Sequence, residues 1–379
     1  MSIADFLAFV NKRKMLYYKG NMKHLNALNR IEGIGAQKMR LLVGFFGSAE
    51  AAWKADFPDL EKSGIGKAAA AKVIEQRKNI DPDAEWEKMQ KENIRLIDWE
   101  SSDYPILLRE ISNPPYLLYA RGNLDLNSAP IISIVGSRKY TQYGKQVAEN
   151  FSRELARAGI IVASGMAIGI DSFAHRGALN AGGKTVAVLA DSLDNEHLHP
   201  RINFNMSQEI LENGLLLSEY AVPTESLPVL FPARNRIVAG LSMGTLIIEA
   251  GEKSGSLITA TLALEFNREI FAVPGPIFSP QSFGTNDLIK KGAKVVTSIR
   301  DILEELNLGK IKKSNQSFLK IPENKEEEIL LKILSTDPLH IDNIAKISKL
   351  GTVSVLSNLT LMELKGWVRN IGGQNYILL

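Results

Sequence analysis

The sequence of 379 residues contains no cysteine. This absence excludes disulfides, thiolate nucleophiles, iron–sulfur clusters and cysteine-based zinc sites, and it fits a reducing compartment. An excess of one charge is also missing, because 45 Lys and Arg against 42 Asp and Glu leave a net charge of only +3. This balance is not typical of a strongly basic chromatin protein. Any nucleic-acid site must therefore gather its positive charge locally.

Long hydrophobic runs are absent too. No apolar stretch approaches the ~20 residues of a membrane span, and the early charges at Asp5 and Lys12 are not those of a signal peptide. We therefore expect a cytoplasmic protein without a membrane span. At ~150 residues per domain, the length predicts two or three domains.

Residues 1–90 are predicted to form a helical domain. The stretch 6–31 holds six Lys or Arg and no Asp or Glu, which indicates a basic patch hidden by the total charge. Two Gly-Ile-Gly turns follow it, and each opens a helix. Glycine tolerates a positive φ there, and free N–H groups at a helix N-terminus favour phosphate. The candidate backbone contacts are Gly33, Gly35, Gly64, Gly66 and Lys67.

These turns resemble helix-hairpin-helix motifs, here in a SAM-like helical domain, and such motifs contact nucleic-acid backbone without reading sequence. A helical bundle used only for packing or for contact with a partner is the open alternative.

Residues 91–307 are predicted to form one domain, in which short β-branched runs alternate with amphipathic helices from residue 131 onward. The expected strands are 131–135, 160–164, 185–189, 215–218, 245–249, 269–273 and 294–297, with helices over 143–158, 202–211 and 256–266. This alternation predicts an α/β domain with a Rossmann-like, doubly wound, mostly parallel sheet. Ligands should bind where loops leave the carboxyl ends of its strands.

Small and hydroxyl residues follow several of these strands, as in an anion site. The candidate binding residues in these loops are Gly136, Ser137, Arg138, Ser164, Gly165, Ser254, Gly255, Ser256 and Thr259. The loop after strand 215–218 is expected to add Phe231, Arg234, Asn235 and Arg236. Arginines beside an aromatic ring suit single-stranded nucleic acid, because charge follows the backbone and bases stack. The alternative is a core phenylalanine with arginines in surface ion pairs.

Signals for catalysis are weak. No Gly-x-Gly-x-x-Gly motif for a dinucleotide follows the first strand. Residues 178–185 resemble a P-loop, but a helix precedes them and a strand follows, which is the reverse of the order in a P-loop. His197 and His199 with Asp194 could be drawn as metal ligands, although a solvated loop is favoured. Asp171 with His175 could form an acid–base pair, but no nucleophile is evident. We expect no catalytic residue, no metal and no cofactor.

The C-terminal part has two sections. Residues 308–325 are lysine-rich and polar, which predicts a linker. Residues 326–379 read as helices over 327–334, 341–348 and 353–364, followed by a hairpin over 367–378 that turns at Gly372 and Gly373. This order is typical of a winged helix, which contacts nucleic acid or protein; contact with protein is slightly favoured here.

Several motifs together resemble the DNA-processing protein A (DprA) family, also called Smf. They are Ile134 to Arg138, Ser164 to Asp171, Phe231 to Ser242, Glu249-Ala250, Ser254 to Ala260 and Val273 to Gly275. The resemblance implies a homodimer, formed through the Rossmann-like domain, that binds single-stranded DNA. It further implies that the protein protects incoming DNA and loads the recombinase RecA during natural transformation. Residues 190–203 depart from the family pattern, since glycines are lost there.

An enzyme is the alternative function. Residues Gly240, Gly244, Thr245 and Glu249 faintly resemble an element of nucleotide phosphoribohydrolases, which act on nucleoside monophosphates. The double glycine of that element is missing, and the two flanking modules suit a polymer better than a small substrate.

Overall fold

The computed structural model describes residues 21–308, 322, 324–335, 337–364 and 367–378. The chain divides into two compact units, with the boundary between Lys313 and Ser314. The first part of the predicted basic stretch, residues 6–20, and most of the predicted linker lie outside the described residues. No helix in the described part of the chain is long and apolar enough to cross a membrane.

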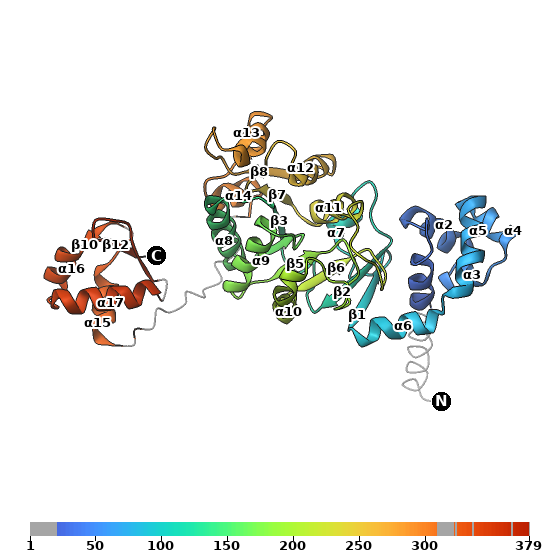
Figure 1. The fold of residues 1–379 in the computed structure, drawn as a ribbon, viewed down its shortest axis with the longest axis horizontal. Helices are drawn as coiled ribbons and strands as arrows, with labels where there is room; N and C mark the ends of the chain where they lie inside the picture. Colours follow the sequence, from blue (N-terminus) through green and yellow to red (C-terminus); the bar gives the residue numbers. More distant parts are fainter. Residues whose placement is uncertain (1–20, 309–321, 323, 336, 365–366, 379) are drawn as a thin grey trace. The chain divides into compact units, whose positions relative to one another are not determined.

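A nine-stranded sheet forms the centre of the first unit (Figure 1), in the order β1-β2-β6-β5-β4-β3-β7-β8-β9. The strands are β1 (Ile94–Asp98), β2 (Leu117–Gly122), β3 (Ile131–Val135), β4 (Ile161–Ser164), β5 (Thr185–Val188), β6 (Leu215–Ser218), β7 (Gly244–Ile247), β8 (Glu269–Ala272) and β9 (Lys294–Val295). From β6 to β9 all neighbours are parallel. The predicted Rossmann-like, mostly parallel sheet is confirmed.

Two strands escaped the sequence prediction. β1 and β2 pair antiparallel with each other, and β2 pairs antiparallel with β6. They precede the strand–helix alternation, so the periodic signal that revealed the parallel strands does not reach them.

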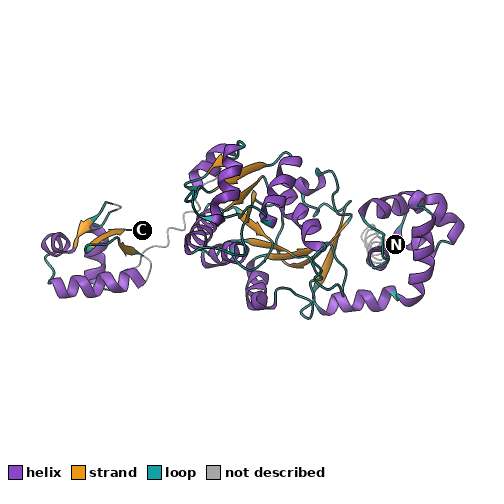
Figure 2. Ribbon diagram, turned by 45° about the horizontal axis from the view of Figure 1, so that its top comes forward, coloured by secondary structure: helices purple, strands orange, loops and turns teal. Residues whose placement is uncertain are grey.

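Helices cover both faces of the sheet (Figure 2). On one face lie α8 (Gln142–Arg157), α9 (Ile170–Asn180) and α14 (Ile299–Glu305), and on the other α7 (Ile106–Arg109), α11 (Leu230–Leu241) and α12 (Gly255–Glu265). α10 (Phe204–Asn213) packs beside β5 and β6, and α13 (Phe283–Lys290) follows β8. Alternate residues of β3 supply the two cores: Ile131 and Val135 face one helix layer, while Ile132 and Ile134 face the other.

Gly177 sets the close approach of α8 and α9. A methyl group there would lie 2.0 Å from the Ser152 hydroxyl oxygen and 2.3 Å from the Glu149 carbonyl oxygen. We expect Gly177→Ala to lower the free energy of unfolding by ~1–3 kcal/mol through overpacking. Gly44→Ala is the control, because a methyl group at this helical position meets nothing within 4 Å and should stabilise by ~0.5–1 kcal/mol. Urea unfolding measures both, and equal midpoints would contradict the packing argument.

The N-terminal helical part contains both predicted glycine turns. Residues 21–29 are helical, and α2 (Ala36–Phe46), α3 (Ala49–Lys54), α4 (Phe57–Leu60), a π turn (Glu61–Ile65), α5 (Lys67–Gln76) and α6 (Pro82–Lys91) follow. Ile34 and Ile65, between the glycines, are buried. Their burial in one core with the sheet explains why each turn alternates glycine and an apolar residue.

The second unit is a winged helix, as predicted. It consists of α15 (Lys325–Ile333), β10 (Leu339–His340), α16 (Ile341–Ser348), α17 (Thr352–Leu364), β11 (Val368–Asn370) and β12 (Asn375–Leu378). The strands pair in the order β10-β12-β11. Gly372 and Gly373, both with positive φ, form the turn of the wing.

Candidate nucleic-acid interface

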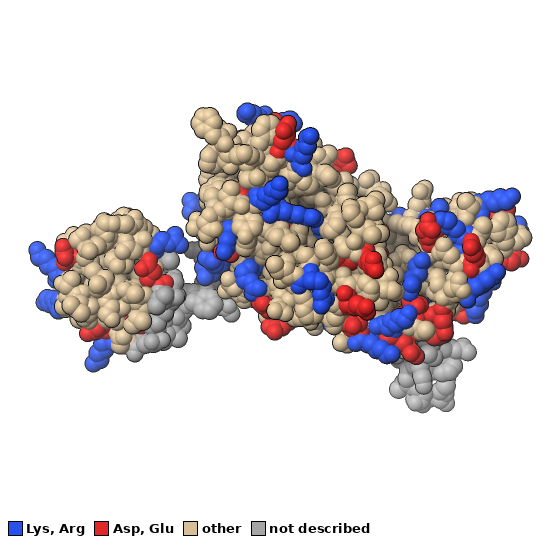
Figure 3. Space-filling view, viewed as in Figure 1, with Lys and Arg blue, Asp and Glu red and all other residues tan. Residues whose placement is uncertain are grey.

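A cavity of about 500 Å³ lies at the carboxyl ends of the parallel strands. Loops after β3, β4, β7 and β8 and the start of α11 line it. The chain order reverses between β3 and β7, and such a switch point is where doubly wound sheets hold their ligands. Figure 3 shows Lys and Arg side chains clustered over the centre of the first unit.

The loop after β3 is fixed before any ligand arrives. The Ser137 N–H donates to the Glu249 carbonyl at 2.8 Å, and the Ser137 hydroxyl donates to the Gln281 side-chain oxygen at 2.8 Å. Gly136 has no room for a side chain, since a methyl group would lie 2.7 Å from Ile170. Ser137 thus joins the loops that follow β3, β7 and β8.

The N-terminus of α12 forms a second wall. The Ser254 hydroxyl accepts the Ser256 N–H, and the two hydroxyl oxygens are 2.7 Å apart. Gly255 and Thr259 complete this wall of the cavity. Hydroxyls and N–H groups at a helix N-terminus favour an anion.

Arg138 supplies a positive charge that is open to a ligand. Its side chain is exposed, and its guanidinium carbon lies 5.0 Å from the centre of the Phe231 ring. Lys139 and Lys253 also line the cavity. Within the described residues, none of these three cations has a carboxylate partner at ion-pair distance. They are therefore free to meet phosphate groups.

Arg234 has a different role. It is only 4% exposed, and it donates to the Gly165 carbonyl at 2.6 Å and to the Val188 carbonyl. The guanidinium thereby ties together the ends of β4 and β5. Gly165 must be glycine in this arrangement, because a methyl group would lie 2.6 Å from the Arg234 guanidinium.

The structure corrects the predicted position of these arginines. Arg234, Asn235 and Arg236 lie in helix α11, whereas the sequence placed them in a loop. Pro232 does not interrupt this helix, because it occupies the first turn, where a missing N–H costs nothing.

Most of the predicted binding residues come together, and two do not. The cavity is lined by Gly136, Ser137, Arg138, Phe231, Arg234, Asn235, Ser254, Gly255, Ser256 and Thr259. Gly165 lines a smaller neighbouring hollow that shares Arg138 and Phe231. Ser164 is buried and donates to the Ile134 carbonyl, while one guanidinium nitrogen of Arg236 donates to both carboxylate oxygens of Glu219, at 2.6 and 2.7 Å. The surface ion-pair alternative therefore describes Arg236.

The sequence prediction missed Lys139, Lys253 and Gln281. The two lysines lie next to predicted motifs, so a search for cations flanking each glycine loop could have found them. Gln281 carried no such signal, because only the fold brings its loop against Ser137.

Burial perturbs the pKa values of three titratable groups at the cavity, of which Asp171 is a lining residue. It raises the pKa of Asp171, although Arg234 opposes the effect. It raises the pKa of Asp191 to about 7, and one oxygen of that carboxyl has no hydrogen-bond partner in the described structure. Burial, with the Arg234 charge, lowers the pKa of His175 to about 3. His175 bonds Thr185 at 2.7 Å, so the proposed acid–base pair with Asp171 is not supported.

The Asp191 pKa predicts a dependence of stability on pH. Between about pH 4 and about pH 7 the folded protein keeps a proton that the unfolded chain loses, so the free energy of unfolding falls as the pH rises. The steepest slope from one group is ~1.4 kcal/mol per pH unit. Asp191→Asn should remove the part of this fall that Asp191 contributes, while the raised pKa of Asp171 acts in the same direction in both proteins.

Comparing the variant with the wild type isolates Asp191, because Asp171 and His175 are common to both. The low pKa of His175 acts in the opposite direction, adding stability as the pH rises from about 3 to 6.5. Urea unfolding at several pH values provides the comparison. Parallel pH profiles for the two proteins would refute the assignment.

Glu249, which the enzyme alternative would need as a functional carboxylate, makes structural hydrogen bonds instead. It is 2% exposed and accepts hydrogen bonds from the N–H and hydroxyl of Thr141, the residue that caps the N-terminus of α8. Its carboxylate also fills the space beside Gly144, where a methyl group would lie 2.2 Å from it. Glu249 is not among the residues that line the cavity.

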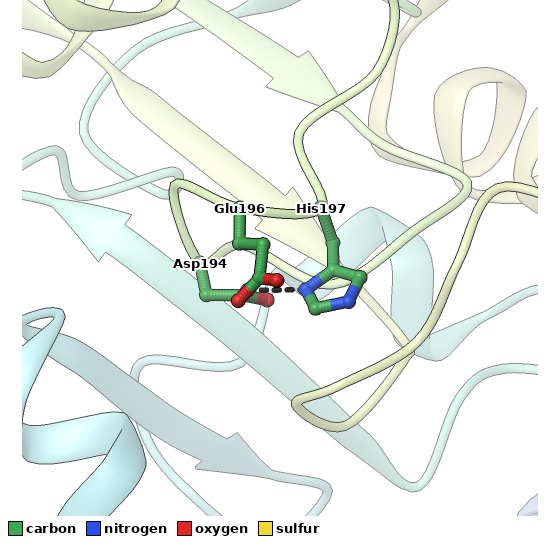
Figure 4. A group of neighbouring side chains, drawn as sticks. All are labelled: Asp194, Glu196 and His197. Atoms are coloured by element: carbon green, nitrogen blue, oxygen red, sulfur yellow. Dashed lines mark hydrogen bonds and ion pairs between the residues drawn. The ribbon is translucent and has the colours of Figure 1, made fainter.

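Asp194, Glu196 and His197 come together in the loop that departs from the family pattern (Figure 4). Each offers one potential ligand atom, all within 4.8 Å of one another. His197 Nδ1 is already hydrogen-bonded to Asp194, which raises the pKa of His197, and Asp194 also accepts from Ser192. A metal would have to displace the bond to His197, so the group is best described as a hydrogen-bonded loop.

The two glycine turns have the geometry expected of backbone contacts. Gly33, Gly64 and Gly66 have positive φ, and Gly35 and Gly66 precede α2 and α5 without a side-chain cap. Within the described part of the chain, no atom outside the neighbouring residues lies within 4 Å of a methyl group built at Gly35 or Gly66. Lys67 is exposed beside the second turn.

Comparison with known proteins gives consistent matches. The family model "DNA recombination-mediator protein A" matches residues 95–307, and the model "DprA winged helix domain" matches residues 318–374. The chain is 33% identical to Protein Smf of Synechocystis, over 92% of this chain and 97% of that protein. DNA processing protein A of Streptococcus pneumoniae is structurally similar, with a TM-score of 0.65 and 33% identity over 76% of this chain and 97% of that one. DNA processing protein A of Helicobacter pylori, whose structure is described with a single-stranded DNA binding mode, is also similar. Its TM-score is 0.51, and it is 34% identical over 56% of this chain and 96% of that one.

Proposed function

This chain belongs to the DNA recombination-mediator protein A family, and we propose that it binds single-stranded DNA in the cavity at the carboxyl edge of its sheet. One observation carries the proposal. Arg138, which has no carboxylate partner in the described chain, places its guanidinium carbon 5.0 Å from the centre of the Phe231 ring. A single strand needs both, because its phosphates require charge and its exposed bases require a flat apolar surface. The described single-stranded DNA binding mode of the Helicobacter pylori relative supports the same ligand.

Each wall of the cavity has a part in this proposal. Arg138, Lys139 and Lys253 hold the phosphates, together with the N–H and hydroxyl groups at the start of α12. Phe231 contacts a base. The glycine turns before α2 and α5, with Lys67, give a secondary contact with DNA backbone. Contacts of this kind recognise the chemistry of the strand rather than its sequence.

Anisotropy of matched single- and double-stranded oligonucleotides tests the proposal. We expect a clear preference for the single strand. The three free cations of the cavity predict a slope of about −2 for log affinity against log salt, at ~0.7 per neutralised phosphate. Equal, weak binding of both oligonucleotides would instead assign binding to the helical hairpins. Release of adenine from AMP, if lost in Glu249→Gln, would favour the enzyme alternative.

Finer parts of the function rest on the family resemblance. On that basis the protein protects incoming DNA and loads RecA onto it in the cytoplasm during natural transformation. It acts there as a homodimer formed through the Rossmann-like domain, and it has no catalytic role. Sedimentation of the purified protein checks the dimer, and RecA filament assembly on protein-coated single strands checks the loading.

A further inference from the structure

The loop between β8 and α13, residues 273–282, is fixed at both ends. Near its start, the Asn286 side chain accepts the Gly275 N–H at 3.2 Å and donates to the Gly275 carbonyl at 3.1 Å. Near its end, Gln281 accepts the Ser137 hydroxyl at 2.8 Å and lines the cavity. The loop is therefore an ordered part of the cavity rim.

The tip of this loop presents two apolar side chains to solvent. The Ser279 N–H donates to the Pro276 carbonyl at 2.9 Å, which closes a four-residue turn with Ile277 and Phe278 at its corner. These side chains are 81% and 93% exposed. Turn corners usually hold Gly, Pro, Asn, Asp or Ser. Almost none of the Phe278 surface is buried against the described part of the chain, so intramolecular packing does not account for the ring.

The exposed ring stands close to the cavity. Gln281 is the third residue after Phe278, and an extended chain spans at most ~3.6 Å per residue, which gives a limit of ~11 Å between them. β8 is parallel to β7, so its loop leaves the same edge of the sheet as the loop that leads to α12 (Figure 1). The loop that carries the ring therefore borders the cavity through Gln281, on the side of β8.

We propose that Phe278 stacks on a base of the single strand whose neighbouring nucleotide lies in the cavity. This inference rests on the proposed function. Residues 274–282 contain no charged side chain, so the loop is suited to bases while the cavity holds the phosphates. Every base offers a flat face, which makes such stacking tolerant of sequence.

A nucleobase fits this surface better than a second copy of the chain. An aromatic side chain offers ~150–250 Å² of contact, whereas a stable interface takes ~800 Å² from each partner. A single base needs no more than the ring.

Oligothymidylates of about four and about sixteen nucleotides, which bracket common site sizes, test this stacking. Phe278→Ala should bind the longer oligonucleotide about 5- to 150-fold more weakly than the wild type, and the shorter one equally well. Phe278→Tyr should restore binding. In strands carrying 2-aminopurine, the wild type should quench the fluorescence of the base, and Phe278→Ala should not. Phe45→Ala, which removes a ring that is 53% exposed on α2, is the matched control.

Three outcomes would overturn the inference. Phe278→Ala could bind the longer strand as tightly as the wild type, or it could lose affinity equally for both lengths. It could also lose self-association in sedimentation at unchanged affinity, which would make the tip a contact between copies. Failure of the wild type to bind either oligonucleotide would refute the proposed function itself.

Discussion

Arg138→Glu is expected to weaken the binding of a single-stranded oligothymidylate at least ~100-fold. The substitution removes the cation beside Phe231 and places a negative charge where phosphate would lie. The log–log salt slope should also become shallower by ~0.7, because one phosphate contact is lost. Anisotropy titrations across a salt series measure both effects.

Stability should not change in this variant. Arg138 is exposed and forms no ion pair within the described chain, so its replacement should alter the free energy of unfolding by less than ~0.5 kcal/mol. Arg157→Glu is the control, since it makes the same charge change at the last residue of α8, ~22 Å along the helix from its start. Equal affinities for Arg138→Glu and Arg157→Glu would remove Arg138 from the binding site.

Arg234→Met, by contrast, should destabilise the fold by ~3–5 kcal/mol. The change leaves the Gly165 and Val188 carbonyls without their donor. It also deprives the buried Asp171 and Asp191 of a nearby cation. Binding should fail as well, because the loop that carries Gly165 loses its anchor. Urea unfolding, measured beside DNA binding, separates this variant from Arg138→Glu.

Arg236→Met is the matched control on the same helix. Its guanidinium forms a pair with Glu219 that is only partly buried, so its loss should cost less than ~1 kcal/mol. Similar unfolding midpoints for Arg234→Met and Arg236→Met would show that the buried guanidinium does not hold the strand ends together.

The fold and the cavity edge were predictable because their signals are local. Short apolar runs that alternate with amphipathic helices indicate a parallel sheet, and this pattern places the loops after β3 and β7 at one edge. Glycine and hydroxyl residues in those loops then indicated the anion site. Arg138 could be placed at this edge because it directly follows Gly136 and Ser137 in the loop after β3.

The rest depends on contacts between distant segments. Arg138 and Arg234 look equivalent in the sequence, and both lie near Phe231, yet one is exposed and the other is buried. The difference arises from carbonyl groups 69 and 46 residues away, which no local pattern reports. Gln281 lines the cavity for the same reason, because its side chain bonds to Ser137, which is 144 residues away in the sequence.

The bonds that Ser137 makes to Glu249 and Gln281 also bear on the thermodynamics of capture. They hold three loops together in the free protein, so little additional ordering entropy is lost from the protein when a strand enters. Most of the conformational entropy lost on binding is then that of the DNA, because the flexible strand becomes ordered in the cavity. Differences in affinity among strands should accordingly follow their own stiffness, and appear chiefly in dissociation rates.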